Sequence, residues 1–312
     1  MRAFFQLIRW VNLVIIAVTM IVVRYIVVKP LLAYREIDLQ IESWVFNIII
    51  FSTLSITAAG YIINDFFDIE IDKINKPAKK HFKENTLYTL YWIFNIVGLG
   101  GACFLYIYFK NINIFIFFLM VSGALWFYSS QYKKQLIVGN LIVATLTALV
   151  PIMVLWFDMF VIKNKFGEKL QLLNIDLSYI IWWIAGFSFF AFLLTMIREI
   201  TKDIEDFEGD KAYGCNTMPV VFGVHTTKTI IIALSSIVIA LLIYIYINYL
   251  SDKLTLIYIA SFLILPLIFT IYKLIVANNQ KHYNLISLLF KLIMVFGICY
   301  AFVAWYILEN NI

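Results

Sequence analysis

Two short acidic segments of this chain carry Asp at identical spacings. Each reads Asp-x-x-Asp-x-x-x-Asp-Lys, once within residues 64–73 and once within residues 202–211. Oxygen ligands without His or Cys favour a hard cation, Mg²⁺ or Ca²⁺. Mg²⁺ typically takes one or two carboxylates and completes its shell with substrate phosphate oxygens. Two such clusters facing one another would hold two or three ions around a diphosphate.

The spacing within each motif also predicts a shared face. At 3.6 residues per turn, positions i, i+3 and i+7 lie within about 60° of one another, so a continuous helix would project all three carboxylates together. Like charges repel unless a cation neutralises them. A single acidic segment beside a membrane is usually a solvated connection, but two matched segments on one side weaken that interpretation. The motif acids are Asp65, Asp68 and Asp72, then Asp203, Asp206 and Asp210.

Basic residues accompany both motifs. Lys73 closes the first, Lys133 and Lys134 follow another apolar stretch, and Arg198 with Lys202 lead into the second. Lys offers phosphate a point charge and Arg a bidentate fork. A site that holds an anion with metals and cations at the mouth of an apolar helical bundle is typical of one that binds an isoprenoid diphosphate. The pair at 133–134 is explained equally well as positive anchors at a membrane surface.

The elements that must position these groups are membrane spans. The chain has 312 residues, of which 63% are hydrophobic and 14% charged, whereas soluble domains are near 45–50% apolar and about 25% charged. We therefore expect an all-α integral membrane protein with no nucleic-acid partner. The three Cys and three His are scattered, so no disulfide framework, zinc site or Ser-His-Asp arrangement is indicated. The first apolar run is too long for a signal-peptide core and is expected to be a retained span.

Nine stretches are long enough to cross a bilayer, which takes about 20 apolar residues. The N-terminus and the connections after even-numbered spans carry nearly twice as many Lys and Arg as the other connections, which predicts a cytoplasmic N-terminus. Both motifs follow even-numbered spans and are expected at the cytoplasmic side of the cell (inner) membrane. The predicted organisation is one membrane-embedded domain, 1–312, with two four-helix halves and a ninth helix. The predicted spans are 6–28, 43–63, 87–109, 112–130, 137–157, 178–198, 228–250, 254–274 and 285–307.

Both motifs resemble the signatures of a known family, the intramembrane UbiA prenyltransferase superfamily. The first signature is matched by Asn-Asp-x-x-Asp-x-x-x-Asp from Asn64, followed by Asn75 and Pro77. The second is matched by the run 198–210, with Gly, Thr and Pro following at 214, 217 and 219. Tyr128 with the two lysines at 133–134 resembles the family's connection between spans 4 and 5. Arg9 and Asn12 resemble its polar pair in the first span.

This resemblance implies a helical bundle with a central cavity and Mg²⁺-dependent transfer of a prenyl group from a diphosphate donor to a lipophilic acceptor. By motif match, Asn64, Asp68 and Asp72 would bind one Mg²⁺–diphosphate, with Asp65 in support. The second motif's Asp203, Asp206 and Asp210 would bind the other. The predicted catalytic residues are Asp68, Asp72, Asp206 and Asp210, and the predicted substrate-binding residues are Asn12, Asn64, Lys73, Tyr128, Lys133, Lys134, Arg198 and Lys202.

The acceptor is less constrained by the sequence than the donor. The second motif is most similar to that of members making digeranylgeranylglyceryl phosphate, which favours geranylgeranylglyceryl phosphate as the acceptor. The basic run 76–83 departs from the family pattern and suits either a phosphorylated acceptor or anionic membrane lipids. Three alternatives stay open: an aromatic or quinone-precursor acceptor, an inactive scaffold, and a divalent-cation transporter, although transporters usually carry ionisable groups near the membrane midplane.

Overall fold

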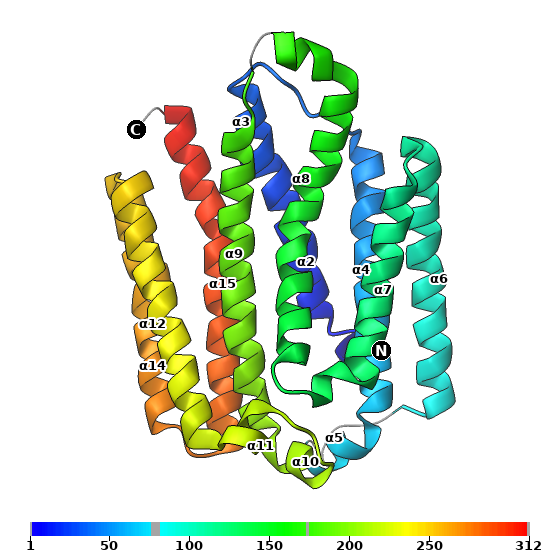
Figure 1. Cartoon of the computed structure of the whole chain (residues 1–312), viewed down its shortest axis with the longest axis vertical. Coiled ribbons are helices and arrows are strands. Elements are labelled where there is room, and N and C mark those ends of the chain that lie inside the picture. The colour runs from blue at the N-terminus through cyan, green and yellow to red at the C-terminus, as the bar shows by residue number, and fades with distance from the viewer. Residues whose placement is uncertain (1, 76–81, 173–174, 311–312) are drawn as a thin grey trace. The chain divides into compact units, whose positions relative to one another are not determined.

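The computed structural model describes residues 2–75, 82–172 and 175–310, and the regular elements of this part are all helical (Figure 1). Within these ranges, nine helices are long and apolar enough to cross a membrane. The all-α fold with nine candidate spans is thus confirmed, whereas the N-terminal orientation stays a prediction. In chain order the elements are α1 (Arg2–Leu7), α2 (Trp10–Val22), the π-helix η1 (Val23–Val28), α3 (Lys29–Ala33), α4 (Ser43–Phe67), α5 (Ile69–Asn75), α6 (Glu84–Phe109), α7 (Ile112–Ser130), the 3₁₀ turn η2 (Tyr132–Lys134), α8 (Val138–Leu172), α9 (Ser178–Glu205), α10 (Phe207–Ala212), α11 (Met218–Phe222), α12 (Val224–Tyr249), α13 (Lys253–Tyr258), the π-helix η3 (Ile259–Ile264), α14 (Leu265–Val276) and α15 (Gln280–Asn310).

The chain forms two compact units, each built from separate stretches of sequence. Unit 1 comprises Met1–Val18, Ile41–Ile142 and Glu208–Asn216. Unit 2 comprises Thr19–Gln40, Val143–Phe207 and Thr217–Ile312. The second acidic motif is therefore divided between the units, and its last part belongs with the first motif. The organisation as one domain of two four-helix halves stays a prediction.

In unit 1, α4 packs against both α6 and α7, which lie beside it in Figure 1. Close approach of α4 and α6 depends on two glycines. A Cβ added to Gly98 would lie 2.6 Å from Ile56 Cγ1 and 3.1 Å from the Ile56 backbone nitrogen. A Cβ on Gly101 would overlap the Ser52 hydroxyl, whereas one on Gly100 would meet nothing within 4 Å. Small residues that let backbones approach are typical of helix pairs in membranes.

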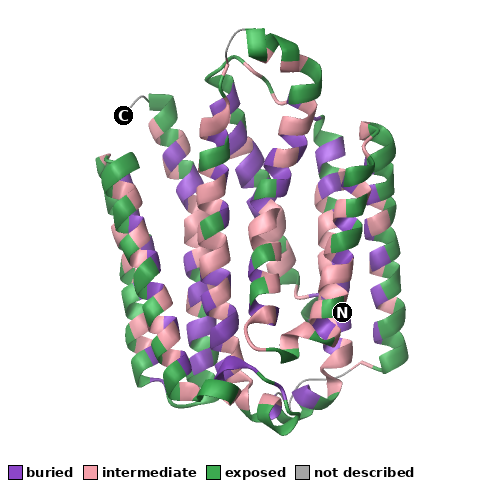
Figure 2. Cartoon of the chain, viewed as in Figure 1, coloured by how far each residue is buried: buried purple, intermediate pink, exposed green. Residues whose placement is uncertain are grey.

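Helices such as α6 and α12 bury a narrow stripe of residues, which recur every three or four positions, whereas α4 is buried over a wider surface because it packs against two helices (Figure 2). The stripe contains small and polar side chains as well as large apolar ones, because helices in lipid gain little from burying apolar surface and associate through close packing and hydrogen bonds. In unit 1, for example, Ser122 of α7 donates to Asn95 Oδ1 of α6 at 2.6 Å. On α6 the buried residues are Leu87, Tyr91, Asn95, Gly98, Ala102 and Leu105, and on α12 they are Thr227, Ile231, Ser235, Val238 and Leu242.

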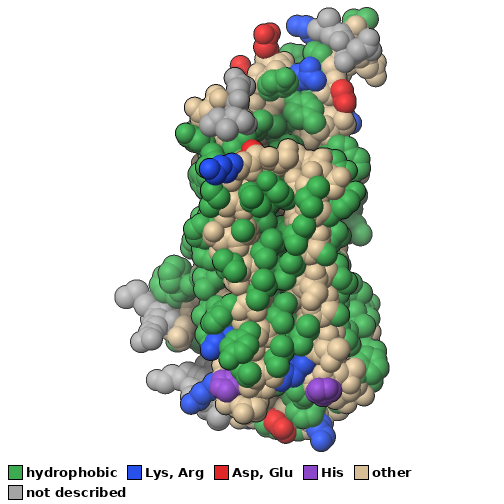
Figure 3. Space-filling model, turned by 90° about the vertical axis from the view of Figure 1, so that its left-hand side faces the viewer, with side chains coloured by type: hydrophobic (Ala, Val, Ile, Leu, Met, Phe, Trp, Pro, Cys, Tyr) green, Lys and Arg blue, Asp and Glu red, His purple; other side chains and the backbone are tan. Residues whose placement is uncertain are grey.

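In unit 2, α9 packs against α12 and α15, and α14 packs against α15. The face that carries α12 and α14 is covered largely by hydrophobic side chains, with charged groups gathered toward its two ends and His near one of them (Figure 3). This distribution suits a lipid-facing surface whose ends reach the polar interfaces. Exposed apolar residues on these helices include Ile237, Ile243, Ile247, Leu265, Ile268, Phe269 and Tyr272.

Two of the spans in the described residues contain a π-helical turn, and a proline follows two positions after the end of each turn. η1 is followed by Lys29-Pro30 and η3 by Leu265-Pro266. Proline removes a backbone donor and its ring clashes with the carbonyl four residues earlier. A locally widened helix accommodates both effects without ending the span. The first span consequently continues to Ala33, beyond the predicted limit at residue 28.

Other span limits also differ from the predictions. The first span begins at Trp10 rather than at residue 6, because Arg9 has a left-handed backbone (φ 49°) that separates α1 from α2. The fifth span was expected at 137–157, but α8 runs over 35 residues to Leu172. At about 1.5 Å per residue it extends roughly 50 Å, well beyond a bilayer core of about 30 Å. The last turns of α8 contain several polar residues, so hydropathy alone did not include them in the predicted span.

A buried ion pair lies inside unit 2, between η1 and α8. The Arg24 guanidinium makes a two-pronged contact with Asp158, from Nε to Oδ2 at 3.3 Å and from Nη2 to Oδ1 at 3.4 Å. The Arg24 side chain is 0% and the Asp158 side chain 1% exposed. Arg24 lies within the span Trp10–Ala33, so the structure places its charge inside a span rather than in a connection between spans. The pairing keeps both charges tolerable in an apolar interior.

Gly98→Ala is expected to destabilise the protein by about 1–3 kcal/mol, because the added methyl overlaps Ile56 in a closely packed contact. Gly100→Ala is the matched control on the same helix. It adds a methyl in open space and improves helix propensity. Thermal unfolding in detergent should show a lower Tm for the first variant alone. Equal Tm values would contradict the proposed closeness of α4 and α6.

Arg24→Met and Asp158→Leu are each expected to destabilise the protein by roughly 3–5 kcal/mol, because each leaves an uncompensated buried charge. The double variant removes both charges and should recover most of the loss. Unfolding of the four proteins in the same detergent measures the coupling. Additive losses in the double variant would show that the two charges do not stabilise one another.

Candidate functional site

The first acidic motif spans a bend rather than a straight helix. α4 ends at Phe67, Asp68 has φ −95° and ψ −2°, and α5 begins at Ile69. The hydrogen bonds of the ladder continue through the bend, since Asp68 N–H donates to Asn64 O at 3.0 Å and Asp72 N–H to Asp68 O at 2.8 Å. The expectation of one uninterrupted helical face is thus corrected. The bend changes the direction of the chain after Asp68, while the backbone N–H groups of Asp68 and Asp72 stay hydrogen-bonded.

Asp68 is the central carboxylate of this motif. Its Oδ2 accepts a hydrogen bond from Asn64 Nδ2 at 2.7 Å, and its Oδ1 forms an ion pair with the Lys133 ammonium. Lys133 comes from η2, in the connection between α7 and α8. Both side chains are largely buried, at 16% and 13% exposure respectively. The structure therefore brings together three residues that the sequence nominated from segments about 65 positions apart.

Lys133 also lies in the electrostatic field of the second motif. Burial lowers the pKa of its ammonium to about 8, and the Asp210 carboxylate acts in the opposite direction by favouring the charged form. Asp210 belongs to α10, and this part of the second motif lies in unit 1. Two further bonds hold the segment there: Asn75 Oδ1 accepts from Gly209 N–H at 2.8 Å, and Asn216 N–H donates to Lys134 O at 2.8 Å.

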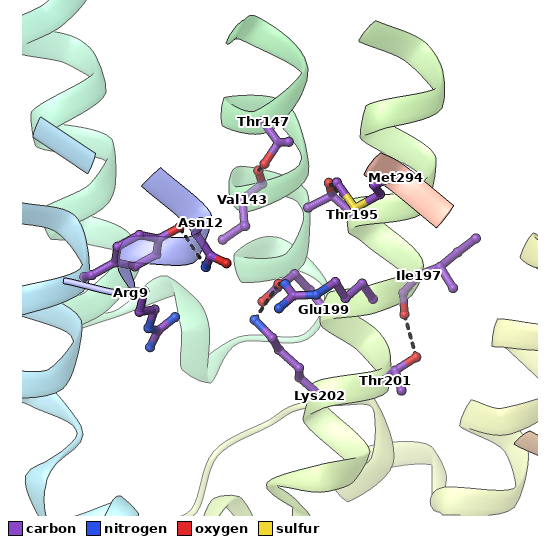
Figure 4. Close-up of polar contacts among 12 residues, drawn as sticks. Arg9, Asn12, Val143, Thr147, Thr195, Ile197, Glu199, Thr201, Lys202 and Met294 are labelled. Atoms are coloured by element: carbon purple, nitrogen blue, oxygen red, sulfur yellow. Dashed lines mark hydrogen bonds and ion pairs between the residues drawn. The ribbon is translucent and has the colours of Figure 1, made fainter. Parts of the chain in front are cut away.

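A second ion pair flanks the first motif. The Arg9 guanidinium lies 3.7 Å from Asp65 Oδ1 and stacks 4.8 Å above the Tyr61 ring. The Tyr61 hydroxyl accepts from Asn12 Nδ2 at 3.2 Å. The polar pair at positions 9 and 12 is thus tied to α4 close to the acidic motif, and Figure 4 shows the hydrogen bond of Asn12. Tyr61 was not anticipated, although it lies one helical turn before Asp65.

The second motif repeats the bend of the first. α9 ends at Glu205, and Asp206 has φ −95° and ψ 9°, close to the values of Asp68. Asp206 N–H donates to Lys202 O at 2.8 Å, as Asp68 does to Asn64. Matching positions of the two motifs therefore share a local backbone conformation as well as residue types. This supports the interpretation of the motifs as two versions of one ligand-binding device.

Within unit 2, the cations before the second motif are held by an acid. Glu199 Oε1 accepts from Arg198 Nη1 and from Lys202 Nζ, both at 2.7 Å (Figure 4). Glu199 was not nominated as a site residue. Glu199 directly follows Arg198 and lies three positions before Lys202. This place between two candidate phosphate-binding cations was the sequence signal that could have identified it. The arrangement orders both cations on one turn of α9.

The other predicted site residues have diverse settings. Asp72 is buried on α5, whereas Asp203, Asp206 and Tyr128 are half-buried. Lys73 is exposed and pairs with Glu70 at 2.5 Å, a hydrogen bond that raises the pKa of its ammonium. Lys134 is exposed, and its carbonyl oxygen accepts the hydrogen bond from Asn216 N–H. The basic run expected near the acceptor falls mostly at 76–81, which lie outside the described residues.

The donor set fits a hard divalent cation. Across the described ranges, no three Asp, Glu, His or Cys side chains converge on a single point. Mg²⁺ does not require such a cluster, because it usually takes one or two carboxylates and fills its shell with water and phosphate oxygens. The carboxylate of Asp68 already faces one cationic group, the Lys133 ammonium. The oxygens of Asn64 and Asp68, with Asp72 beyond the bend, are the ligands through which unit 1 would hold Mg²⁺.

Comparison with known proteins decides the family. A model of the UbiA prenyltransferase family matches residues 25–295. The chain belongs to the UbiA prenyltransferase family. It is accordingly a multi-pass membrane protein, in agreement with its nine apolar helices within the described residues. The resemblance of the two motifs to the family's signatures is confirmed at the level of the family.

Curated members of the UbiA family resemble this chain over much of its length. It is 37% identical over 186 residues to digeranylgeranylglyceryl phosphate synthase of Thermococcus sibiricus, which covers 59% of each chain and thus less than two thirds of that relative. It is 32% identical over 230 residues to the protein of the same name from Sulfurisphaera tokodaii, which covers 72% of each.

Solved structures of UbiA proteins share the fold. One, concerning the biosynthesis of digeranylgeranylglyceryl phosphate synthase in membranes, is 25% identical with a TM-score of 0.61 and covers 97% of this chain and 98% of that one. A UbiA homolog from Archaeoglobus fulgidus, solved with DMAPP and Mg²⁺ bound, is 16% identical with a TM-score of 0.54 over 96% of this chain and 99% of its own. The second likeness shows the fold alone.

Proposed function

We propose that this UbiA family member is a Mg²⁺-dependent prenyltransferase that moves a geranylgeranyl group from its diphosphate to geranylgeranylglyceryl phosphate. The observation that carries the proposal is the Asp68 arrangement, in which a carboxylate is held by the Asn64 amide and the Lys133 ammonium at the point where the Asp210 segment joins the first motif. The names of the similar curated proteins support the choice of acceptor. The proposed location is the cell membrane, with the motifs on the cytoplasmic side.

The chemistry required of the site is charge stabilisation. When the allylic C–O bond breaks, the diphosphate leaves with the electron pair and the carbon becomes cationic. Bound Mg²⁺ would neutralise the developing negative charge on the diphosphate. The buried ammonium of Lys133 adds a fixed positive charge in a low-dielectric setting, where it costs little reorganisation. In unit 2, Glu199 holds the Arg198 guanidinium and the Lys202 ammonium on one turn of α9, and both are groups of the kind that bind phosphate.

The acceptor hydroxyl oxygen then forms the new bond to the allylic carbon, and its proton passes to the released diphosphate. Water must be kept from the cation during this step, because it would compete for the same carbon. Aromatic rings adjoin the first motif, where Phe67 packs edge-on against Trp126 at 6.2 Å and Phe66 lies 6.1 Å from Tyr88. Ring faces stabilise a nearby cation electrostatically and exclude water. Phe66, Phe67 and Trp126 pack against the apolar cluster of unit 1 beside the first motif, and we assign them to the exclusion of water there.

The proposal is tested with purified protein, geranylgeranyl diphosphate and an acceptor panel of geranylgeranylglyceryl phosphate, 4-hydroxybenzoate, dihydroxynaphthoate and homogentisate. We expect a product with the first acceptor alone, and loss of the reaction in EDTA. Prenylation of only an aromatic acceptor would overturn the acceptor assignment. Divalent-cation flux in liposomes without any transfer would favour a transporter.

Asp68→Asn is expected to abolish transfer, lowering kcat/KM by about 1,000-fold or more, because the neutral amide cannot neutralise a divalent cation or pair with Lys133. Glu70→Gln is the matched control, since Glu70 lies two positions away but is exposed. The control should retain near wild-type turnover in the same detergent. A folded Asp68→Asn protein with a wild-type rate would remove the first motif from the mechanism.

Lys133→Met is expected to lower kcat/KM for the donor by about 10- to 100-fold, the range for loss of a hydrogen bond to a charged group. Lys134→Met should cause a much smaller loss, because the Lys134 side chain is exposed whereas Lys133 is buried against Asp68. Initial rates over a range of donor concentrations measure both. Equal losses would indicate that the two lysines act only as a general positive surface.

A further inference from the structure

A direct hydrogen bond between Asn75 and Gly209 links the segments that carry the two acidic motifs. Asn75 is the last residue of α5 and lies three positions after Asp72. Gly209 lies in α10 and directly precedes Asp210. Asn75 Oδ1 accepts from Gly209 N–H at 2.8 Å, across 134 positions of sequence. Both residues are buried, and both belong to unit 1.

The contact leaves no room for a side chain at position 209. A Cβ added to Gly209 would lie 2.5 Å from Asn75 Nδ2 and 2.6 Å from Cγ and Oδ1, distances that real Cβ atoms essentially never show. The backbone of Gly209 is helical, in contrast to the left-handed glycines at 214 and 223. The absence of a side chain, rather than an unusual φ, is thus what position 209 requires. The amide of Asn75 fills the space that the missing Cβ leaves.

The bond has a direct consequence for the carboxylates. Asp72 is one turn from Asn75 on α5, and Asp210 adjoins Gly209 on α10, so the bond ties the turns that carry these two acids. The other connections of the segment are to the same region: Lys134 O accepts from Asn216, and Asp210 acts on the pKa of Lys133. The end of the second motif is thus fixed to the first motif and to the lysine that pairs with Asp68.

We propose that Asn75 and Gly209 are positioning residues that set the separation between the carboxylates of Asp72 and Asp210, and thereby the fit of the metal-bound diphosphate. The inference rests on the proposed function. The positioning role belongs to the contact between the two residues, because neither side chain alone has the chemistry to bind the diphosphate. Neither is required to touch the substrate. A small shift of one motif against the other is sufficient to impair binding of a group held by ligands from both.

Three variants separate this role from ordinary packing. Gly209→Ala places a methyl against Asn75 and should lower kcat/KM by about 100-fold. Asn75→Ala leaves the buried Gly209 N–H without its acceptor and should cost about tenfold. The double variant removes the overlap, and should be more active than Gly209→Ala alone. Gly123→Ala in α7 is the control, because its Cβ would meet nothing within 4 Å.

The decisive readout is binding of Mg²⁺ with inorganic pyrophosphate, measured in detergent by the rise in Tm as the two are titrated together. The wild type should respond, Gly209→Ala should need about tenfold more Mg²⁺ for half of its response, and the double variant should need less than Gly209→Ala. A double variant no better than Gly209→Ala would overturn the positioning role, as would wild-type Mg²⁺ requirements in all variants. A wild type without any response would instead overturn the proposed function on which the role rests.

Discussion

Ionised carboxylates at the edge of an apolar helical bundle must be neutralised, and this constraint explains the polar architecture of the protein. Asp68 is paired with Lys133, Asp65 with Arg9, Glu199 with Arg198 and Lys202, and Asp158 with Arg24. Each pairing compensates part of the desolvation that burial imposes. For Asp68 and Asp65 the compensation comes from residues of other segments, so these two ion pairs also determine which segments lie together.

The two motifs solve the problem of presenting several acids in the same way. Asp68 and Asp206 share nearly the same backbone conformation at the end of a span, and a short helix follows each. A straight helix would have lined up the carboxylates but directed the chain further along the span axis. The bend turns the last acid of each motif onto a short helix, and in unit 1 these helices, α5 and α10, are joined through Asn75 and Gly209.

The membrane sets different rules for the rest of the chain. Lipid provides no water for exposed backbone groups, so each span stays helical even where proline interrupts its ladder, with η1 and η3 as the local adjustment. Helix contacts depend on glycines such as Gly98 and on polar pairs such as Asn95 with Ser122. The Arg24–Asp158 pair is the extreme case of the same rule, because it places two full charges within a span and neutralises them locally.

The sequence by itself determined the class of fold, the number of spans and the chemistry of the motifs, because hydropathy and acid spacing are local properties of the chain. It nominated Asn64, Asp68 and Lys133 but could not show that they meet. It also did not show that Arg24 is buried inside a span, since a single charge near a span end resembles a loop residue until its partner Asp158 is known. Which stripe of each helix is buried was not readable either, because lipid-facing and packed surfaces are both apolar. The bends at the second Asp of each motif, and the contact that joins α5 to α10, were decided only by tertiary structure, through pairings between residues far apart in sequence.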